Sequence, residues 1–158
     1  MGRRLLSSRT HAEFFGVPTD SDALIRHYLL SGDDIDLIRT RRRAENHLGF
    51  AVHICLLRYP GLGWSEDIMP PAELIAWLAE QLQIDACSLG EYAVRRNTRH
   101  EHHALAMRHL GLSPFGPQHV RQAEDIATRA AFATDHGVKI VETLVAELRK
   151  KHLVLPSV

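Results

Sequence analysis

Cysteine and long hydrophobic runs are scarce in this sequence of 158 residues. Its two cysteines, Cys55 and Cys87, lie among apolar neighbours, which favours reduced core thiols in a cytoplasmic protein over a disulfide framework. No stretch reaches the roughly 18 apolar residues of a membrane helix, and the basic N-terminus lacks the apolar segment of a secretory signal. We therefore expect neither a secreted nor a membrane protein, and no collagen-like chain.

Sequence motifs of catalytic sites are also missing. Neither a phosphate-binding G-x-x-x-x-G-K loop nor a G-x-S-x-G nucleophile motif occurs. In the histidine-rich run 99–103, His100 is followed four residues later by Ala104, whereas zinc proteases have a second histidine there. His103 could share a ligand face with His100, but no cysteine or carboxylate completes four ligands locally. We expect no catalytic residue, metal or cofactor; a small metal-dependent hydrolase would require stoichiometric zinc.

Lysine is scarce, and net charge is absent. The 19 lysines and arginines balance 19 acidic residues, so only local clusters can indicate a partner. Only Lys139, Lys150 and Lys151 are lysines, which leaves 16 arginines. Arginine presents a planar pair of donors that fits phosphate and guanine edges, which favours nucleic acid. A GC-rich genome explains the same excess without any function.

Apolar residues at helical spacing run through the whole chain, with no sustained alternation typical of strands. The sequence therefore predicts an all-α fold, with one multi-helix domain over residues 1–158. Residues 44–59 are apolar nearly all round, which predicts a central helix with neighbours on every side. The predicted helices are 8–15, 20–31, 33–43, 44–59, 70–82, 86–94, 98–110, 118–134 and 138–151.

Two basic clusters are the candidates for binding. The first is the arginine run 41–43 with Asn46 beside it, and the second surrounds the start of the predicted helix 98–110. Thr98 and Glu101 have the spacing of a capping box, and residues 98–103 are polar on every side, so we expect these turns to project from the core. With the short helix 86–94 before them, they indicate a helix-turn-helix-like unit, whose second helix presents its first residues to DNA. A solvated surface helix explains the pattern equally well.

Two segments resemble conserved motifs of one family. Residues 46–61 (NHLGFAVHICLLRYPG) are similar to the N-R-L-G-x-A-x-Q-x-x-x-x-R-x-x-G segment near the start of Tn-three-family transposases, the replicative enzymes of class II transposons. Residues 91–102 (EYAVRRNTRHEH) resemble that family's E-Y-x-x-R-x-x-T-R-x-x-H segment, and Leu155-Pro156 resembles its later L-P. The order and spacing agree over nearly the whole chain. One departure is His47, where the family usually has arginine.

The resemblance implies an N-terminal fragment that recognises the terminal inverted repeats of a transposon. The family's catalytic RNase H-like domain, with acidic residues that hold Mg²⁺, lies far downstream, so this fragment is expected to be no enzyme by itself. Its expected partners are double-stranded DNA and the remaining domains of the transposase. The predicted DNA-binding residues are Arg41, Arg42, Arg43, Asn46, Arg95, Arg96, Asn97, Thr98, Arg99 and His102.

Within this set we expect Arg99 and His102 to meet base edges, and the arginine run to lie along phosphates. Tyr92 is expected in the core. The rival interpretation is a helical module for protein interaction and assembly, without direct DNA binding. The apolar tail 153–158 supports that rival, because such residues are normally covered.

Overall fold

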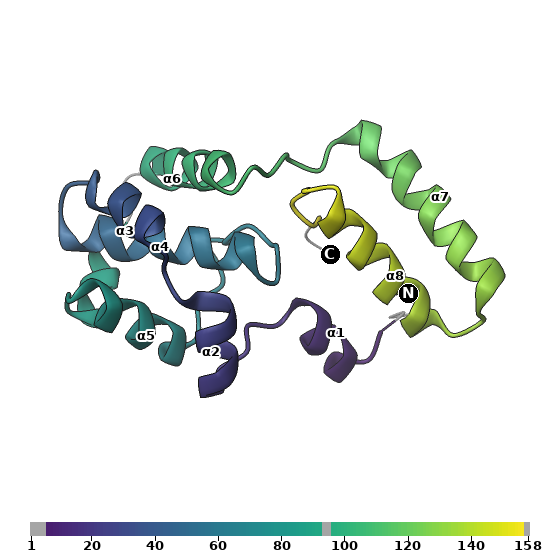
Figure 1. Cartoon of the computed structure of the whole chain (residues 1–158), viewed down its shortest axis with the longest axis horizontal. Helices are drawn as coiled ribbons and strands as arrows, with labels where there is room; N and C mark the ends of the chain where they lie inside the picture. Colours follow the sequence, from purple (N-terminus) through teal and green to yellow (C-terminus); the bar gives the residue numbers. More distant parts are fainter. Residues whose placement is uncertain (1–5, 93–95, 157–158) are drawn as a thin grey trace.

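The computed structural model describes residues 6–92 and 96–156, and in these ranges the regular structure is entirely helical. Figure 1 shows α2 to α6 gathered on one side and α7 paired with α8 on the other, with α1 between them. The all-α prediction is confirmed. The elements are α1 (Ser8–Phe15), α2 (Ser21–Tyr28), α3 (Gly32–Arg39), α4 (Ala44–Arg58), α5 (Ala72–Leu82), the 3-10 helix η1 (Ala86–Glu91), α6 (Arg96–His109), α7 (Pro117–Ala133) and α8 (Gly137–Lys150).

Helix α4 is the centre of the larger hydrophobic cluster. Every side chain from Leu48 to Leu57 is buried, so the prediction of a central helix is confirmed. Helices α2, α3, α5, α6 and η1 all pack against it. A Cβ on Gly49 would overlap the ring of Tyr92, which explains a glycine inside this helix: only the bare backbone lets Tyr92 pack against it. Tyr92 itself is buried, as predicted.

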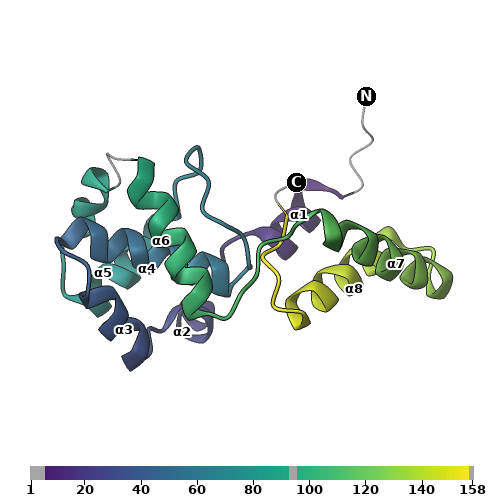
Figure 2. The same cartoon turned by 90° about the horizontal axis from the view of Figure 1, so that it is seen from above.

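The smaller hydrophobic cluster is built by α8 and the C-terminal tail. Leu153 and Leu155 are buried there together with Val145 and Leu148 of α8. Leu153 and Leu155 of the tail are therefore covered by this chain itself, which weakens the support that the tail gave to the rival interpretation; residues 157–158 lie outside the described ranges. Figure 2 shows the same two groups of helices from above.

Hydrogen bonds join the two clusters. The amide of Leu155 donates to the carbonyl of Gly61 at 2.8 Å. The Arg149 guanidinium donates to the carbonyl of Pro60 at 2.8 Å through Nη2, and lies over the Tyr59 ring, 5.3 Å from its centroid. These contacts fasten the end of α8 to the segment that leaves α4.

Several predicted boundaries differ from the structure. Helix α3 ends at Arg39, so residues 40–43 form a turn. The predicted helix 86–94 is a 3-10 helix over Ala86–Glu91, and residues 93–95 lie outside the described ranges. Helix α6 begins at Arg96, so Thr98 lies inside the helix and is not its cap. Cys87 is exposed and only Cys55 is buried, although both thiols are free. Within the described ranges, no helix is long and apolar enough to cross a membrane.

Buried Asp34 ties three helices together. Its carboxylate accepts hydrogen bonds from Arg58 Nη2 at 2.9 Å and from His109 Nε2 at 2.7 Å, and it caps α3 through the amide of Ser31. Burial raises the pKa of Asp34, but these donors outweigh it and hold the pKa below its ordinary value. Arg58 and His109 therefore have a structural role: through Asp34 they fix the C-terminal ends of α4 and α6 to α3.

Candidate nucleic-acid interface

Helix α6 lies against α4 (Figure 2). One face of α6 is exposed and mostly polar. The exposed positions follow helical spacing, at Asn97, His100, Glu101, Ala104 and Arg108. The opposite face is buried or half-buried and contains Ala106 at its centre. From Asn97 to Arg108 the helix therefore offers a mainly polar stripe to solvent.

The predicted base contact of His102 is wrong. Its side chain is only 3% exposed, and Nδ1 is 2.8 Å from the hydroxyl of Tyr92. The two rings are stacked, with centroids 5.6 Å apart. Burial, and then the charge of Arg41, lower the pKa of His102 to about 4, so the ring is neutral and packs like an aromatic residue. The expectation that residues 98–103 project on every side fails for this reason.

Arg99 is held on an aromatic stack. Its Cζ lies 4.2 Å from the ring centroid of Trp64, and the rings of Trp64 and Tyr92 are stacked at 5.5 Å. A guanidinium over an indole face is stabilised by the ring quadrupole. One terminal nitrogen, Nη2, is buried and has no hydrogen-bond partner among the described residues. Trp64 has no signal in the sequence that would mark this role, because it is a single tryptophan in an irregular segment without periodicity.

His53 lies beneath the same stack. The ring is 1% exposed, and neither nitrogen has a hydrogen-bond partner within the described ranges. Its neighbours are Trp64, Tyr92 and His103, at centroid distances of 5.2, 6.2 and 6.0 Å. Burial is the main cause that lowers the pKa of His53 to about 3, and electrostatic interactions with His103, Arg99 and His102 lower it further. The inner face of α6 therefore packs on α4 through neutral imidazoles.

The arginine run 41–43 forms the turn between α3 and α4. Arg42 and Arg43 are exposed, and Arg43 has a φ of 73°, which places its backbone in the region that favours glycine. Asn46 donates from Nδ2 to the carbonyl of Arg42 at 2.9 Å, so its amide group stabilises the turn. His47 Nε2 lies 2.6 Å from the carbonyl of Arg41. These local bonds fix the backbone while the two arginine side chains remain in solvent.

One ion pair brings the two basic clusters together. Arg41 Nη1 lies 3.7 Å from Oε1 of Glu101, which joins the arginine turn to the outer face of α6. Asn97 is exposed on that helix, whereas Thr98 and Arg99 are half-buried. Arg95 lies outside the described residues, and Arg96 is described only as the start of α6. The helix-turn-helix prediction is likewise not tested, since residues 93–95, between η1 and α6, lie outside the described residues.

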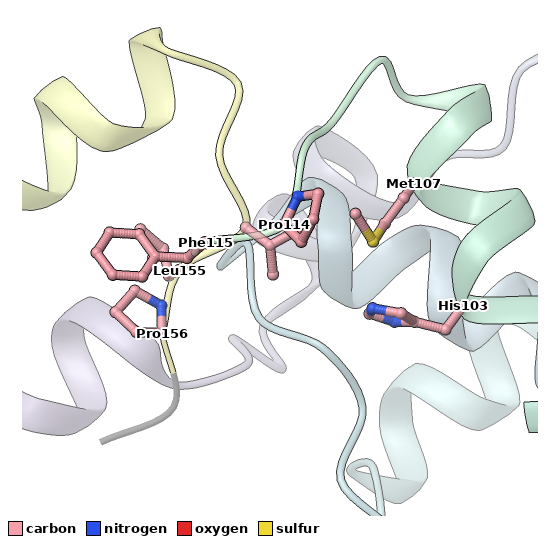
Figure 3. A pocket seen from close by; sticks show the side chains of 7 residues that line it. His103, Met107, Pro114, Phe115, Leu155 and Pro156 are labelled. Carbon is pink, nitrogen blue, oxygen red and sulfur yellow. The ribbon is translucent and has the colours of Figure 1, made fainter. Parts of the chain in front are cut away.

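Figure 3 shows a cavity with His103 and Met107 of α6 on one side and Phe115, Leu155 and Pro156 on the other. It has a volume of about 320 Å³ and lies between α6, the segment before α7 and the C-terminal tail. Its lining consists of His103, Met107, Pro114, Phe115, Val154, Leu155 and Pro156. Among the described residues, no group of three histidines, cysteines or acids is placed to hold a metal ion.

Comparison with known proteins places the whole chain in one family. Residues 5–158 match a family described as a domain of unknown function, DUF4158. The chain is 40% identical over 157 residues to the transposase for transposon Tn3926 of Escherichia coli, and 36% identical over 155 residues to that for Tn21 of the same organism. It is 39% identical over 158 residues to the transposase for Tn501 of Pseudomonas aeruginosa. These matches cover 98–99% of this chain but 16% of each relative.

Proposed function

Because the chain belongs to the DUF4158 family, and its relatives are Tn-three-family transposases, we propose that it is a DNA-binding module that recognises transposon terminal inverted repeats. The chain spans 16% of those relatives' length, so the catalytic RNase H-like domain and its Mg²⁺ are assigned to other parts of a full transposase. The fragment acts in the cytoplasm, and its partners are the DNA ends and the other transposase domains.

The observation that carries this proposal is the ion pair between Arg41 and Glu101. It brings the turn that contains the exposed Arg42 and Arg43 next to the outer face of α6, which supports one shared binding surface. Arg42 and Arg43 neutralise phosphates and set the position of the protein on the duplex. Asn97 and Arg99, with the neighbouring Arg95, Arg96 and Thr98, form the α6 side of the contact. Asn46 supports the turn, and His102 supports α6 from within.

A salt titration tests the proposal. The probe is a duplex selected by the wild-type chain from a randomised pool, with the terminal repeat of Tn501 as a second probe. Contacts to about five phosphates give a slope of log affinity against log salt of about −4 to −5. The double variant Arg42→Ala and Arg43→Ala should flatten that slope by about 2, because two phosphate contacts are lost.

The matched control for this double variant is Arg121→Ala with Arg129→Ala. It removes two exposed arginines from α7, outside the proposed surface, and should leave the slope unchanged. Equal effects of the two double variants would show that only overall charge matters. A wild-type slope near zero would contradict the proposal.

The tip of the α7–α8 hairpin favours a second function, protein assembly. Phe132 is 88% exposed at the end of α7, and Val138 is 44% exposed at the start of α8. Large apolar side chains exposed together favour a protein contact over a nucleic-acid contact. If assembly is the function, the purified chain should self-associate in light scattering, and Phe132→Ser should abolish this association while leaving DNA binding unchanged.

A further inference from the structure

The outer face of α6 contains an acid where phosphate binding favours none. Glu101 is exposed, with 65% of its side-chain surface open to solvent, and it lies beside the arginine turn. A carboxylate on a DNA-facing surface repels phosphates, so this residue weakens every sequence-independent contact nearby. An acid at this place can serve specificity if its repulsion differs between one DNA sequence and another.

Arg41 is held in a fixed orientation beside that acid. Its Nε and Nη2 both donate to the hydroxyl oxygen of Thr40 at 3.1 Å, and the Thr40 hydroxyl donates in turn to the carbonyl of Leu37 at 2.6 Å. The remaining terminal nitrogen, Nη1, is the one that faces Glu101. One edge of the Arg41 guanidinium is therefore held by Thr40, and the other edge is paired with the carboxylate of Glu101.

The pairing with Glu101 is weak enough to be exchanged. The distance of 3.7 Å is longer than that of a charge-assisted hydrogen bond, and the carboxylate is open to water and salt. A carboxylate can also accept a hydrogen bond from the amino group of cytosine in the major groove. Glu101 can therefore leave Arg41 when a base-edge amino group accommodates the carboxylate, and Arg41 is then free to contact a phosphate.

We propose that Glu101 determines specificity: on non-cognate DNA it keeps Arg41 from phosphate, and on the cognate end a base amino group takes up the carboxylate and releases Arg41. This inference rests on the proposed function, since it concerns the same surface. It assigns Glu101 a role in rejecting wrong sequences, in addition to any contact it makes with the right one.

The experiment compares Glu101→Gln with Glu142→Gln in this chain. Both variants raise the net charge by one and release a cation, because Glu142 Oε2 pairs with Lys139 Nζ at 3.2 Å on α8, outside the proposed surface. Affinity is measured over a range of salt for the selected duplex and for a random duplex of equal length. Melting temperatures of the variants are measured in parallel.

For Glu101→Gln we expect the random duplex to bind roughly 3–10-fold more tightly, with the salt slope steeper by about 0.9, because one phosphate contact is gained. The selected duplex should bind Glu101→Gln no more tightly than it binds wild type. The ratio of the affinities for the selected and the random duplex should therefore fall by the same factor or more. Adding Arg41→Ala should remove the gain on random DNA, which assigns that gain to Arg41. Glu142→Gln should change neither duplex.

Two results would overturn the inference. Equal gains in affinity for both duplexes would show that Glu101 weakens DNA binding in general and has no part in specificity. Equal affinities of Glu101→Gln and Glu142→Gln would show that only net charge matters. If wild type binds no duplex at all, the proposed function itself fails, which the wild-type titration shows before any variant is compared.

Discussion

Lowering the pH from 7.5 to 5.5 is expected to destabilise the fold by about 3 kcal/mol, because His53 and His102 must stay neutral between α4 and α6. Their pKa values in the folded chain are about 3 and about 4, against 6.5 for an ordinary histidine. The unfolded chain therefore binds protons that the folded chain rejects once the pH falls below 6.5. Each buried histidine then costs about 1.4 kcal/mol per pH unit until its folded pKa is reached.

The two histidines together account for the expected loss in the free energy of unfolding at pH 5.5. Their contribution to that free energy is fully present above pH 6.5. Asp34 does not contribute in this window, because its pKa lies below the ordinary 3.8. The assay is urea unfolding followed by circular dichroism at both pH values. No change in the free energy of unfolding between them would refute the reasoning.

The variant His53→Leu isolates one of the two histidines. Its expected loss between pH 7.5 and 5.5 is about 1.4 kcal/mol, half that of wild type. At pH 7.5 it should be at least as stable as wild type, because neither nitrogen of His53 has a hydrogen-bond partner to lose within the described ranges. His136→Gln, at an exposed position in the α7–α8 turn, is the control and should retain the wild-type pH dependence.

Two further substitutions test the packing that supports α6, both measured by urea unfolding. Gly49→Ala should destabilise the fold by about 1–3 kcal/mol, because the new methyl group overlaps the Tyr92 ring. The control Gly32→Ala should not destabilise it, because a Cβ there meets nothing within 4 Å. Equal effects of the two substitutions would contradict this packing of Tyr92 on Gly49. Asp34→Asn should cost about 3 kcal/mol, because it breaks a buried charge network with Arg58 and His109, while exposed Asp36→Asn should change stability by less than about 0.5 kcal/mol. A loss below 1 kcal/mol at Asp34 would show that the network contributes little.

The helices could be predicted because their signals are local. The apolar run of α4 needs no knowledge of its neighbours, and Pro60 and Pro71 mark helix boundaries directly. The six residues of η1 are too few for periodicity to separate a 3-10 helix from an α-helix, so the sequence predicts a short helix there but not its kind. Boundaries such as Thr98 failed because a cap sequence also occurs inside helices.

The candidate site was harder to predict, because its geometry depends on residues far apart in the sequence. Polar residues at the start of α6 were expected in solvent, yet His102 is buried because its partner Tyr92 lies before the helix. The position of Arg99 depends on Trp64, from an irregular segment, and no sequence pattern links the two. The arginine run itself is plain in the sequence, but the prediction that it ends a helix over 33–43 is wrong, because the helix ends at Arg39 and residues 40–43 form a turn.

Hydrogen exchange of this chain with and without the selected duplex tests the central claim most directly. The account predicts slower exchange of backbone amides in residues 40–46 and 96–104 when DNA is bound, and no change in the α7–α8 hairpin, residues 117–150. Protection confined to the hairpin, with the arginine turn and α6 unchanged, would contradict it.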